Sequence, residues 1–401
     1  MRVSTAQFYF QNTQQLSNKQ SEVNEQVQYL SSGKRVLTAK DDAVSYGTLA
    51  GYKDELANIE KYKRNITQAE NRNDLQDISF ATGEDIIQEL KQLFIQANNG
   101  TLSDADLKSL AELAGNSQSQ MLDIANNKDE TGGYIFAGYQ IDVEPFAKQP
   151  DGSVNYLGDS GIRELQIAKN VMVNTNQPGD TAFEKVPNPM GDFSANYVTN
   201  TSGISVNKAV IANPGAYNSV ANPPDYKFVF SAPGDLTVTD GLGATVYPTA
   251  PYTAGQTVAF NGLEVQINGN PLPGDEFDLT PQENISIFDT IKSAIDWMNV
   301  GASPVDQTQH DVDYGEILTQ LNSALNHITS QRTEAGVRGQ LIENQENNHL
   351  DRELNLAQGQ SSIEDLDFAK AISTFEQSQV ALQAAQQTFV QIKGLSLFNY
   401  I

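Results

Sequence analysis

Residues 361–401 read SSIEDLDFAKAISTFEQSQVALQAAQQTFVQIKGLSLFNYI, and this stretch at the end of the chain decides the fold. Its apolar residues recur at alternating spacings of three and four, which predicts a helix with one narrow stripe suited to a partner helix. Between Lys370 and Lys393 the only ionisable side chain is Glu376. A helix with so few charges lacks the salt-bridged surface of a free-standing coiled coil, so we expect its other faces to contact protein as well. The stripe consists of Phe368, Ala371, Phe375, Ser378, Leu382, Ala385, Phe389 and Ile392.

A second heptad pattern lies at the opposite end of the chain, in residues 4–30. An ordinary amphipathic helix on a globular core is the alternative interpretation of such a pattern. Because matching narrow stripes stand at both extreme ends of the chain, we favour a coiled coil between the two terminal helices. One column of the heptad holds Tyr9, Leu16, Val23 and Leu30, and the other holds Ala6, Thr13, Gln20 and Val27.

The composition narrows the class of protein. A chain of 401 residues with 39% hydrophobic residues is long enough for two or three domains with a real core. The 50 acidic and 25 basic residues give a formal charge of -25, which repels nucleic acid and anionic membranes. The absence of cysteine excludes disulfides and thiolate chemistry. No apolar run reaches the length of a membrane span, and residues 1–20 lack the features of a signal peptide, so export would need another route.

Two long helices are predicted between the ends of the chain. Residues 43–97 repeat an apolar side chain every seven positions, with Asp41 or Asp42 as the N-cap. A similar pattern begins near Asp313, and we expect it to form a second long helix antiparallel to the first. About fifty helical residues span about 75 Å, which predicts a rod rather than a globule. The repeated positions are Tyr52, Ile59, Ile66, Asn73, Phe80, Ile87 and Phe94 in the first helix, and Tyr314, Leu321, Ile328, Ala335 and Ile342 in the second.

Two shorter helices and a β region complete the pattern. Ser103 and Asp106 resemble a capping box that begins one short helix, which we expect to end at Gly132-Gly133. The other short helix begins at Ser286. Between these helices the chain is rich in Gly, Pro, Asn and Thr and has short β-type runs. Asn261-Gly262 separates two of these runs, which predicts a hairpin with a two-residue turn.

We therefore predict an α+β multidomain protein: a rod of long antiparallel helices, a coiled coil formed by both termini, and an inserted all-β domain at the far end. Three parts are expected. Residues 1–42 and 361–401 form the terminal coiled coil. Residues 43–146 and 284–360 form a helical rod bundle, and residues 147–283 form the inserted β domain.

No catalytic constellation stands out in the sequence. Gly158-Asp-Ser-Gly161 copies the nucleophile motif of trypsin-like proteases, but no histidine precedes it, so we interpret it as a β-turn. His310, Asp311 and Asp313 contain metal-ligating groups, but an Asp-rich start of a helix explains them better. We expect no enzyme activity, no cofactor and no metal.

Four charged residues flank the first predicted loop. Lys34 and Arg35 lie at its beginning, and Asp41 and Asp42 lie at its end. Solvated turn charges are the ordinary interpretation of such pairs. Polar contacts with a neighbouring subunit are the alternative.

Several stretches resemble one known family. Residues 30–36, LSSGKRV, followed by residues 39–42, AKDD, resemble the N-terminal segment of flagellin-type proteins. Residues 363–369, IEDLDFA, are similar to the C-terminal counterpart. Within that family, residues 133–139, GYIFAGY, with Pro145-Phe146 and the opening MRVST, resemble the members that join the hook of the bacterial flagellum to its filament.

The resemblance implies a structural protein of the flagellum. Both terminal helices would line the inner tube, the rod bundle would surround them, and the β domain would project outward. The protein would be secreted by type III export through the flagellum without a cleaved signal peptide, and a cytosolic chaperone would guard the C-terminal helix beforehand. The implied partners are further copies of the chain in a ring, hook-associated protein 1 below and flagellin above. The expected assembly interface comprises Tyr9, Leu16, Val23, Leu30, Phe368, Phe375, Leu382, Phe389 and Ile392.

Two other functions remain open on the sequence alone. The chain could be a divergent flagellin that forms the filament itself, although residues 134–139 argue against this. From a different class, the β insertion could be a hydrolase or a glycan-binding module carried on a flagellar scaffold.

Overall fold

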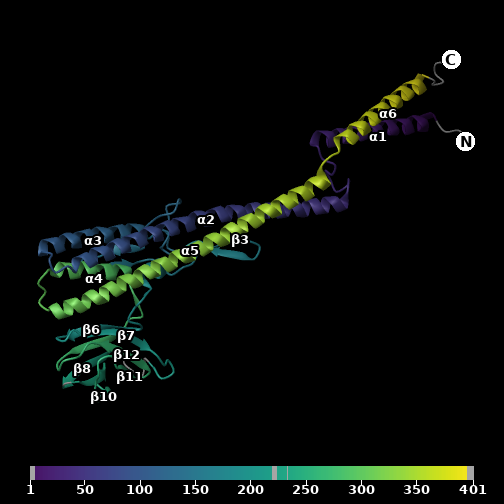
Figure 1. Ribbon diagram of the computed structural model, residues 1–401. Helices are drawn as coiled ribbons and strands as arrows, with labels where there is room; N and C mark the ends of the chain where they lie inside the picture. Colours follow the sequence, from purple (N-terminus) through teal and green to yellow (C-terminus); the bar gives the residue numbers. More distant parts are fainter. Residues whose placement is uncertain (1–4, 219–223, 233, 395–401) are drawn as a thin grey trace. The chain divides into compact units, whose positions relative to one another are not determined.

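The computed structural model describes residues 5–218, 224–232 and 234–394 (Figure 1). The chain forms two compact units. Residues 1–64 and 344–401 belong to the first, and residues 65–343 belong to the second. The terminal segments are helical and the middle of the chain carries antiparallel sheets, as the sequence predicts.

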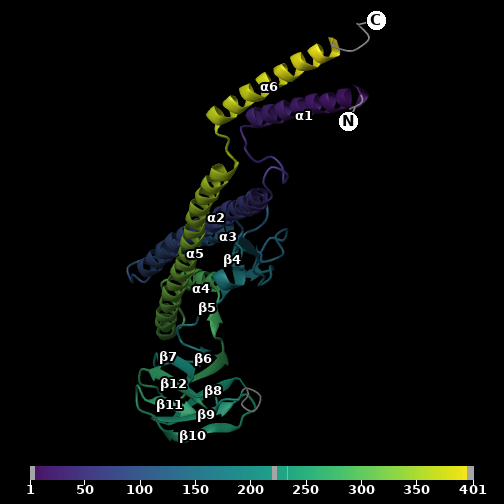
Figure 2. The same ribbon diagram turned by 90° about the vertical axis from the view of Figure 1, so that its right-hand side faces the viewer.

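In the first unit, α1 (Thr5–Ser32) and α6 (Phe368–Gly394) lie side by side (Figure 1, Figure 2). The ring of Tyr9 near the start of α1 meets the ring of Phe389 near the end of α6, with 6.4 Å between centroids. At the other end of the pair, a Cβ on Gly33 would lie 3.5 Å from the ring of Phe368. The two helices are therefore antiparallel, and the predicted pairing of the chain ends is confirmed.

The long helices α2 (Ala43–Ala97) and α5 (Gln307–Glu364) contribute residues to both units. Asp42 is the N-cap of α2, since its carboxylate accepts hydrogen bonds from the amides of Val44 at 3.1 Å and Ser45 at 3.0 Å. The predicted start of α5 near Asp313 is wrong by six residues. Asp306 caps the helix by accepting from the Gln309 amide at 3.0 Å, and the polar first turn carries no apolar pattern that would reveal it.

In the second unit, α3 (Asp104–Ala125) and α4 (Ile287–Val300) pack together. The capping box of Ser103 and Asp106 is confirmed. The predicted end of α3 at Gly132-Gly133 is wrong, because the helix stops at Ala125. Asn126 terminates it, since its side chain accepts from the Phe146 amide at 3.0 Å and donates to the Phe146 carbonyl at 2.8 Å.

The second unit contains two large hydrophobic cores. The first joins the helices to residues 135–156 and 182–186, and Phe183 and Phe146 lie at its centre. Ile167 and Val173, from the strands between these ranges, pack in a smaller cluster on long-helix residues such as Ile66. The elements of this part of the chain are β1 (Phe146–Lys148), β2 (Val154–Tyr156), β3 (Glu164–Ala168), β4 (Val171–Asn174), the π-helical turn η1 (Asp180–Glu184) and β5 (Val186–Pro187), which pairs with β14 (Asn284–Ile285). Part of the segment that we expected in the β domain thus packs on the helices.

The second core fills a β domain made of two antiparallel sheets. One has the strand order β10-β9-β8-β13-β6 and the other has the order β11-β12-β7. The hairpin at Asn261-Gly262 is confirmed, and both residues have the positive φ angles, 47° and 82°, that its turn requires. The strands are β6 (Phe193–Thr199), β7 (Ser205–Ile211), β8 (Tyr226–Ala232), β9 (Asp235–Asp240), β10 (Thr245–Pro251), β11 (Thr257–Phe260), β12 (Leu263–Asn268) and β13 (Glu276–Pro281).

Hydrogen bonds between side chains hold the β domain against α5. The hydroxyl of Tyr197 donates to Oε1 of Glu316 at 2.7 Å, and Nδ2 of Asn200 donates to Oε1 of Gln309 at 2.8 Å. Burial raises the pKa of Glu316 to about 7, and nearby Asp313 adds to the shift. The carboxyl group is therefore bound to its proton more tightly in the folded protein than in the unfolded chain.

This shift predicts that the β domain is held less firmly as the pH rises. Because the pKa in the folded protein lies above the ordinary 4.5, the contribution to stability is complete below pH 4.5 and is lost as the pH rises through 7. We expect a loss of at most about 3 kcal/mol in the wild type. Glu316→Gln should remove this pH dependence, as measured by urea unfolding at pH 5 and pH 8. Glu343→Gln, at an exposed site on α5, is the control, and equal pH dependence in both variants would contradict the prediction.

Candidate assembly interface

The predicted interface residues differ in how deeply their side chains are buried. Val23 and Leu382 are buried between α1 and α6, together with Ala371 and Ser378. Phe368 is half exposed. The side chain of Ile392 lies outside the described residues. The remaining predicted positions, Tyr9, Leu16, Leu30, Phe375 and Phe389, are half-buried.

A second set of apolar side chains points away from the α1–α6 pair. Phe10 is 70% exposed on α1, and Ile372, Val380 and Val390 are 48%, 64% and 66% exposed on α6. These residues stand on faces with almost no charge, which makes them candidates for contact with further protein. We did not single them out from the sequence, because they lie outside the heptad stripe. The nearly uncharged outer face of α6 was the signal that could have identified them.

The loop after α1 is joined to the segment between α5 and α6. The amide of Arg35 donates to the carbonyl of Glu364 at 2.7 Å, and the amide of Leu366 donates to the carbonyl of Gly33 at 3.0 Å. Gly33 has a φ of 68°, which a side chain would disfavour. This backbone bridge fixes the start of α6 next to the end of α1.

The four charged loop residues have partners within their own chain. Nζ of Lys34 lies 2.7 Å from Oε1 of Glu364, and the guanidinium of Arg35 donates to the carbonyl of Ile363 at 2.9 Å. The carboxylate of Asp41 accepts from the amide of Thr38 at 2.8 Å, which lowers the pKa of Asp41. Asp42 caps α2. A role of Lys34, Arg35, Asp41 and Asp42 between subunits stays a prediction.

Glu364 is the polar centre of this junction, and sequence reasoning missed it. It is 4% exposed, and its carboxylate accepts from Gln360 at 2.6 Å, Lys34 at 2.7 Å and Lys53 at 3.2 Å. Burial alone would raise its pKa, but these hydrogen bonds outweigh burial and hold the pKa at about 2. The site joins residues that are more than 300 positions apart in the chain, so no local pattern indicates it.

Glu364→Gln is expected to loosen the junction by about 2 kcal/mol, because a neutral amide loses the ionic hydrogen bonds. Since the pKa in the folded protein lies below the ordinary 4.5, the carboxylate stabilises the junction above pH 4.5, and this contribution is lost as the pH falls toward 2. Hydrogen exchange at the Arg35 and Leu366 amides measures the effect. Glu376→Gln, at an exposed site on α6, should leave their protection unchanged, and unchanged protection in Glu364→Gln would contradict the prediction.

The residues that the sequence analysis weighed as metal ligands or as a nucleophile motif contribute to the packing and turns of the fold. His310 is buried and stacks on Trp297 with 4.1 Å between ring centroids, in the first turn of α5. Within Gly158-Asp-Ser-Gly161, the carboxylate of Asp159 accepts from the Gly161 amide at 2.7 Å, so the motif forms a tight turn. Within the described ranges, no group of three or more His, Asp or Glu residues is placed to hold a metal ion. Over the same ranges, no helix is both long and apolar enough to cross a membrane.

Comparison with known proteins decides the family. Residues 3–141 match the bacterial flagellin N-terminal helical region, and residues 318–401 match the bacterial flagellin C-terminal helical region. The chain belongs to the bacterial flagellin family. The two matched regions contain all of α1 and α6, so the helical pair described above lies within the regions that match the family.

Individual relatives place the chain within the flagellin family. It is 25% identical to the flagellar hook-associated protein 3 of Escherichia coli (strain K12), over 100% of this chain and 99% of the relative. Its similarity to a flagellin of Salmonella enteritidis, 24% identical, covers 66% of this chain and 52% of the relative. The crystal structure of hook-associated protein 3 from Legionella pneumophila is 28% identical, with a TM-score of 0.67 over 78% of this chain and 98% of that one. The chain is thus a structural component of the bacterial flagellum, of the hook-associated protein 3 type.

Proposed function

We propose that this chain is the subunit of a ring that joins the flagellar hook to the filament. The observation that carries the proposal is similarity to hook-associated protein 3 along the whole chain, where the similarity to flagellin covers two thirds. The exposed apolar residues of α1 and α6 supply the surfaces on which neighbouring copies pack. No turnover of a substrate is part of this role.

The proposed partners follow from the same role. Copies of the chain contact each other in the ring, hook-associated protein 1 lies on the hook side, and flagellin lies on the filament side. Before export, the exposed apolar face of α6 needs cover in the cytosol, which a dedicated chaperone provides. The chain then leaves the cell through the flagellum itself without a cleaved signal peptide.

The three-part organisation becomes a proposal about layers in the assembled flagellum. Residues 1–42 and 361–401 form the inner tube, residues 43–146 and 284–360 form the surrounding helical layer, and residues 147–283 form the outer part. The two hydrophobic cores of the second unit support a division within this scheme. They also indicate that the β domain proper begins near Asn188, whose amide donates to the carbonyl of Glu283 at 2.9 Å.

Seeded polymerisation distinguishes the junction protein from a divergent flagellin. The purified chain is mixed with short flagellar fragments and inspected by electron microscopy. A junction subunit adds a limited cap to the fragments. Growth of long filaments from this chain alone would show that it is a filament subunit and would refute the proposal.

A further inference from the structure

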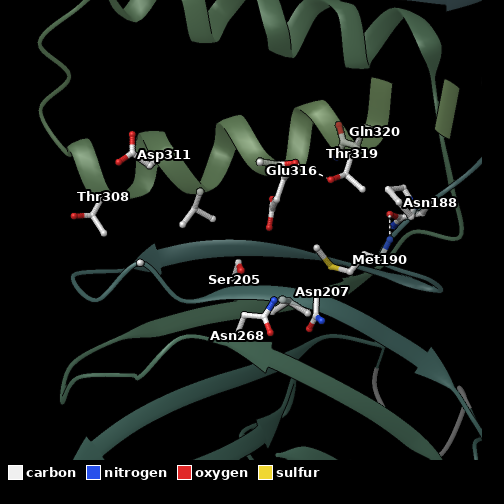
Figure 3. Close-up of a pocket in the computed structure, with 15 residues that line it drawn as sticks. Asn188, Met190, Ser205, Asn207, Asn268, Thr308, Asp311, Glu316, Thr319 and Gln320 are labelled. Atoms are coloured by element: carbon white, nitrogen blue, oxygen red, sulfur yellow. Dashed lines mark hydrogen bonds between the residues drawn. The ribbon is translucent and has the colours of Figure 1, made fainter. Parts of the chain in front are cut away.

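A cavity of about 590 Å³ lies between the first turns of α5 and the β domain (Figure 3). Its size falls within the range of roughly 300–1,000 Å³ that is typical of small-molecule sites. The residues that line it all belong to the second unit, and the assembly role proposed above does not use it. Its contents are therefore a separate question.

The two walls of the cavity present polar side chains to each other. On α5, Thr308, Asp311, Glu316 and Thr319 all line the cavity, so they lie on the same side of the helix. Opposite them stand Asn207 on β7 and Asn268 at the end of β12. Figure 3 shows Glu316 extending from the helix toward the strands, with the two asparagine side chains lying below it.

Several of these polar groups are unused by the protein. Within the part of the chain that the structure describes, the side chains of Asn207, Asn268 and Thr308 make no hydrogen bond to protein. Nearby Asn188 differs, because its side-chain amide donates to the carbonyl of Phe193 at 3.0 Å and to that of Gln282 at 2.7 Å. Asn188 also lines the cavity but is used by the fold, whereas the exposed side-chain amides of Asn207 and Asn268 are available to a ligand.

Gly315 is a second, independent feature of the cavity. It lies in the interior of α5, where glycine is the least favourable residue after proline. A Cβ at this position would meet no atom within 4 Å, and its φ is not positive, so neither packing nor backbone conformation requires glycine. The missing side chain leaves the helix backbone open to the cavity, which is how glycine permits close approach of a ligand.

The charges of the lining narrow the class of ligand. The described residues that line the cavity include the carboxyl groups of Asp311 and Glu316 and no Lys, Arg or His, so anionic ligands are disfavoured. Because burial raises the pKa of Glu316 to about 7, this group keeps its proton below that pH, where it attracts a cation only weakly. An uncharged ligand rich in hydroxyl groups remains.

We propose that this cavity binds an uncharged saccharide. Its hydroxyl groups would donate to and accept from the Asn207 and Asn268 amides and the Thr308 hydroxyl, and Glu316 would hydrogen-bond it from the helix side. The half-buried side chain of Val312 would cover its C–H face. Gly315 would admit the sugar ring against the helix backbone.

The test uses the full-length chain on a printed array of neutral and charged glycans, followed by calorimetry at pH 6.5 with each neutral glycan that binds. We expect at least one neutral saccharide to bind saturably. Gly315→Leu should weaken this binding at least about tenfold by filling the cavity. Gly336→Leu is the matched control, since Gly336 is also an exposed glycine of α5 whose Cβ would meet nothing, and it should retain affinity within about twofold.

Both substitutions replace a helical glycine by a better helix former, so neither is expected to unfold the chain. Failure of every neutral glycan to bind the wild type would overturn the proposal. An equal loss of saccharide affinity in Gly315→Leu and Gly336→Leu would also overturn the proposal, because binding would then not involve the cavity. Saturable binding of trilysine that Gly315→Leu abolishes, with no saccharide bound, would instead identify a site for cations.

Discussion

Cells that carry Leu382→Asp in place of the wild-type chain are expected to be non-motile. Leu382 is 8% exposed and packs between α6 and α1, so an aspartate there places an uncompensated charge inside the helix pair. We expect the substitution to destabilise the packing of α1 against α6 by about 3–5 kcal/mol, which is enough to separate the two helices. Swimming in soft agar and electron microscopy of the flagella measure the loss of assembly.

Val380→Asp separates the two surfaces of α6. Val380 is only two residues away, but its side chain is 64% exposed and points away from α1. The α1–α6 pair should therefore stay helical by circular dichroism while assembly is lost, whereas Leu382→Asp should lose helical signal in the isolated chain as well. If Leu382→Asp also lowers the unfolding transition reported by Trp297, the terminal helices are part of the core of the second unit, and the account is wrong.

Phe183→Ala is expected to destabilise the helical core of the second unit by about 3–5 kcal/mol. Phe183 lies on η1, within the segment that we expected to belong to the β domain. Its ring nevertheless packs on the rings of Phe136 and Phe288, with 5.1 Å and 6.0 Å between ring centroids. Urea unfolding followed by fluorescence measures the loss. The chain has a single tryptophan, Trp297, and it packs on Phe94 in the same core, with 5.1 Å between ring centroids.

Phe230→Ala is the matched control for this prediction. Phe230 is as deeply buried as Phe183 but lies in the core of the β domain, beside Tyr252. The Phe230→Ala substitution should reduce the protection of β8 amides from hydrogen exchange. It should leave the urea unfolding transition reported by Trp297 fluorescence unchanged. Equal effects of both substitutions on Trp297 would show that the two cores unfold as one.

Much of the fold follows from local patterns. The heptads predict α1, α2 and α6 because a repeated apolar stripe needs only one periodicity. The turn at Asn261-Gly262 is predicted because two consecutive positive φ angles demand these residues. The start of α5 and the end of α3 were misplaced because side-chain hydrogen bonds of Asp306 and Asn126 set them, not hydrophobicity.

The functional surfaces were less predictable for a physical reason. The carboxylate of Glu364 acquires its role from Lys34 and Lys53, which lie more than 300 positions away along the chain. Exposed Val380 and Val390 look like ordinary helix residues until the partner of α6 is known. Likewise, the packing of Phe183 on helices depends on contacts that a β-rich composition does not reveal.

The central claim is that this chain joins the hook to the filament. Electron microscopy of a strain that lacks the protein, combined with an assay of flagellin in the culture medium, tests it most directly. We expect hooks without filaments, with flagellin shed into the medium, and rescue by the wild-type chain. Filaments of normal length on the hooks of this strain would contradict it.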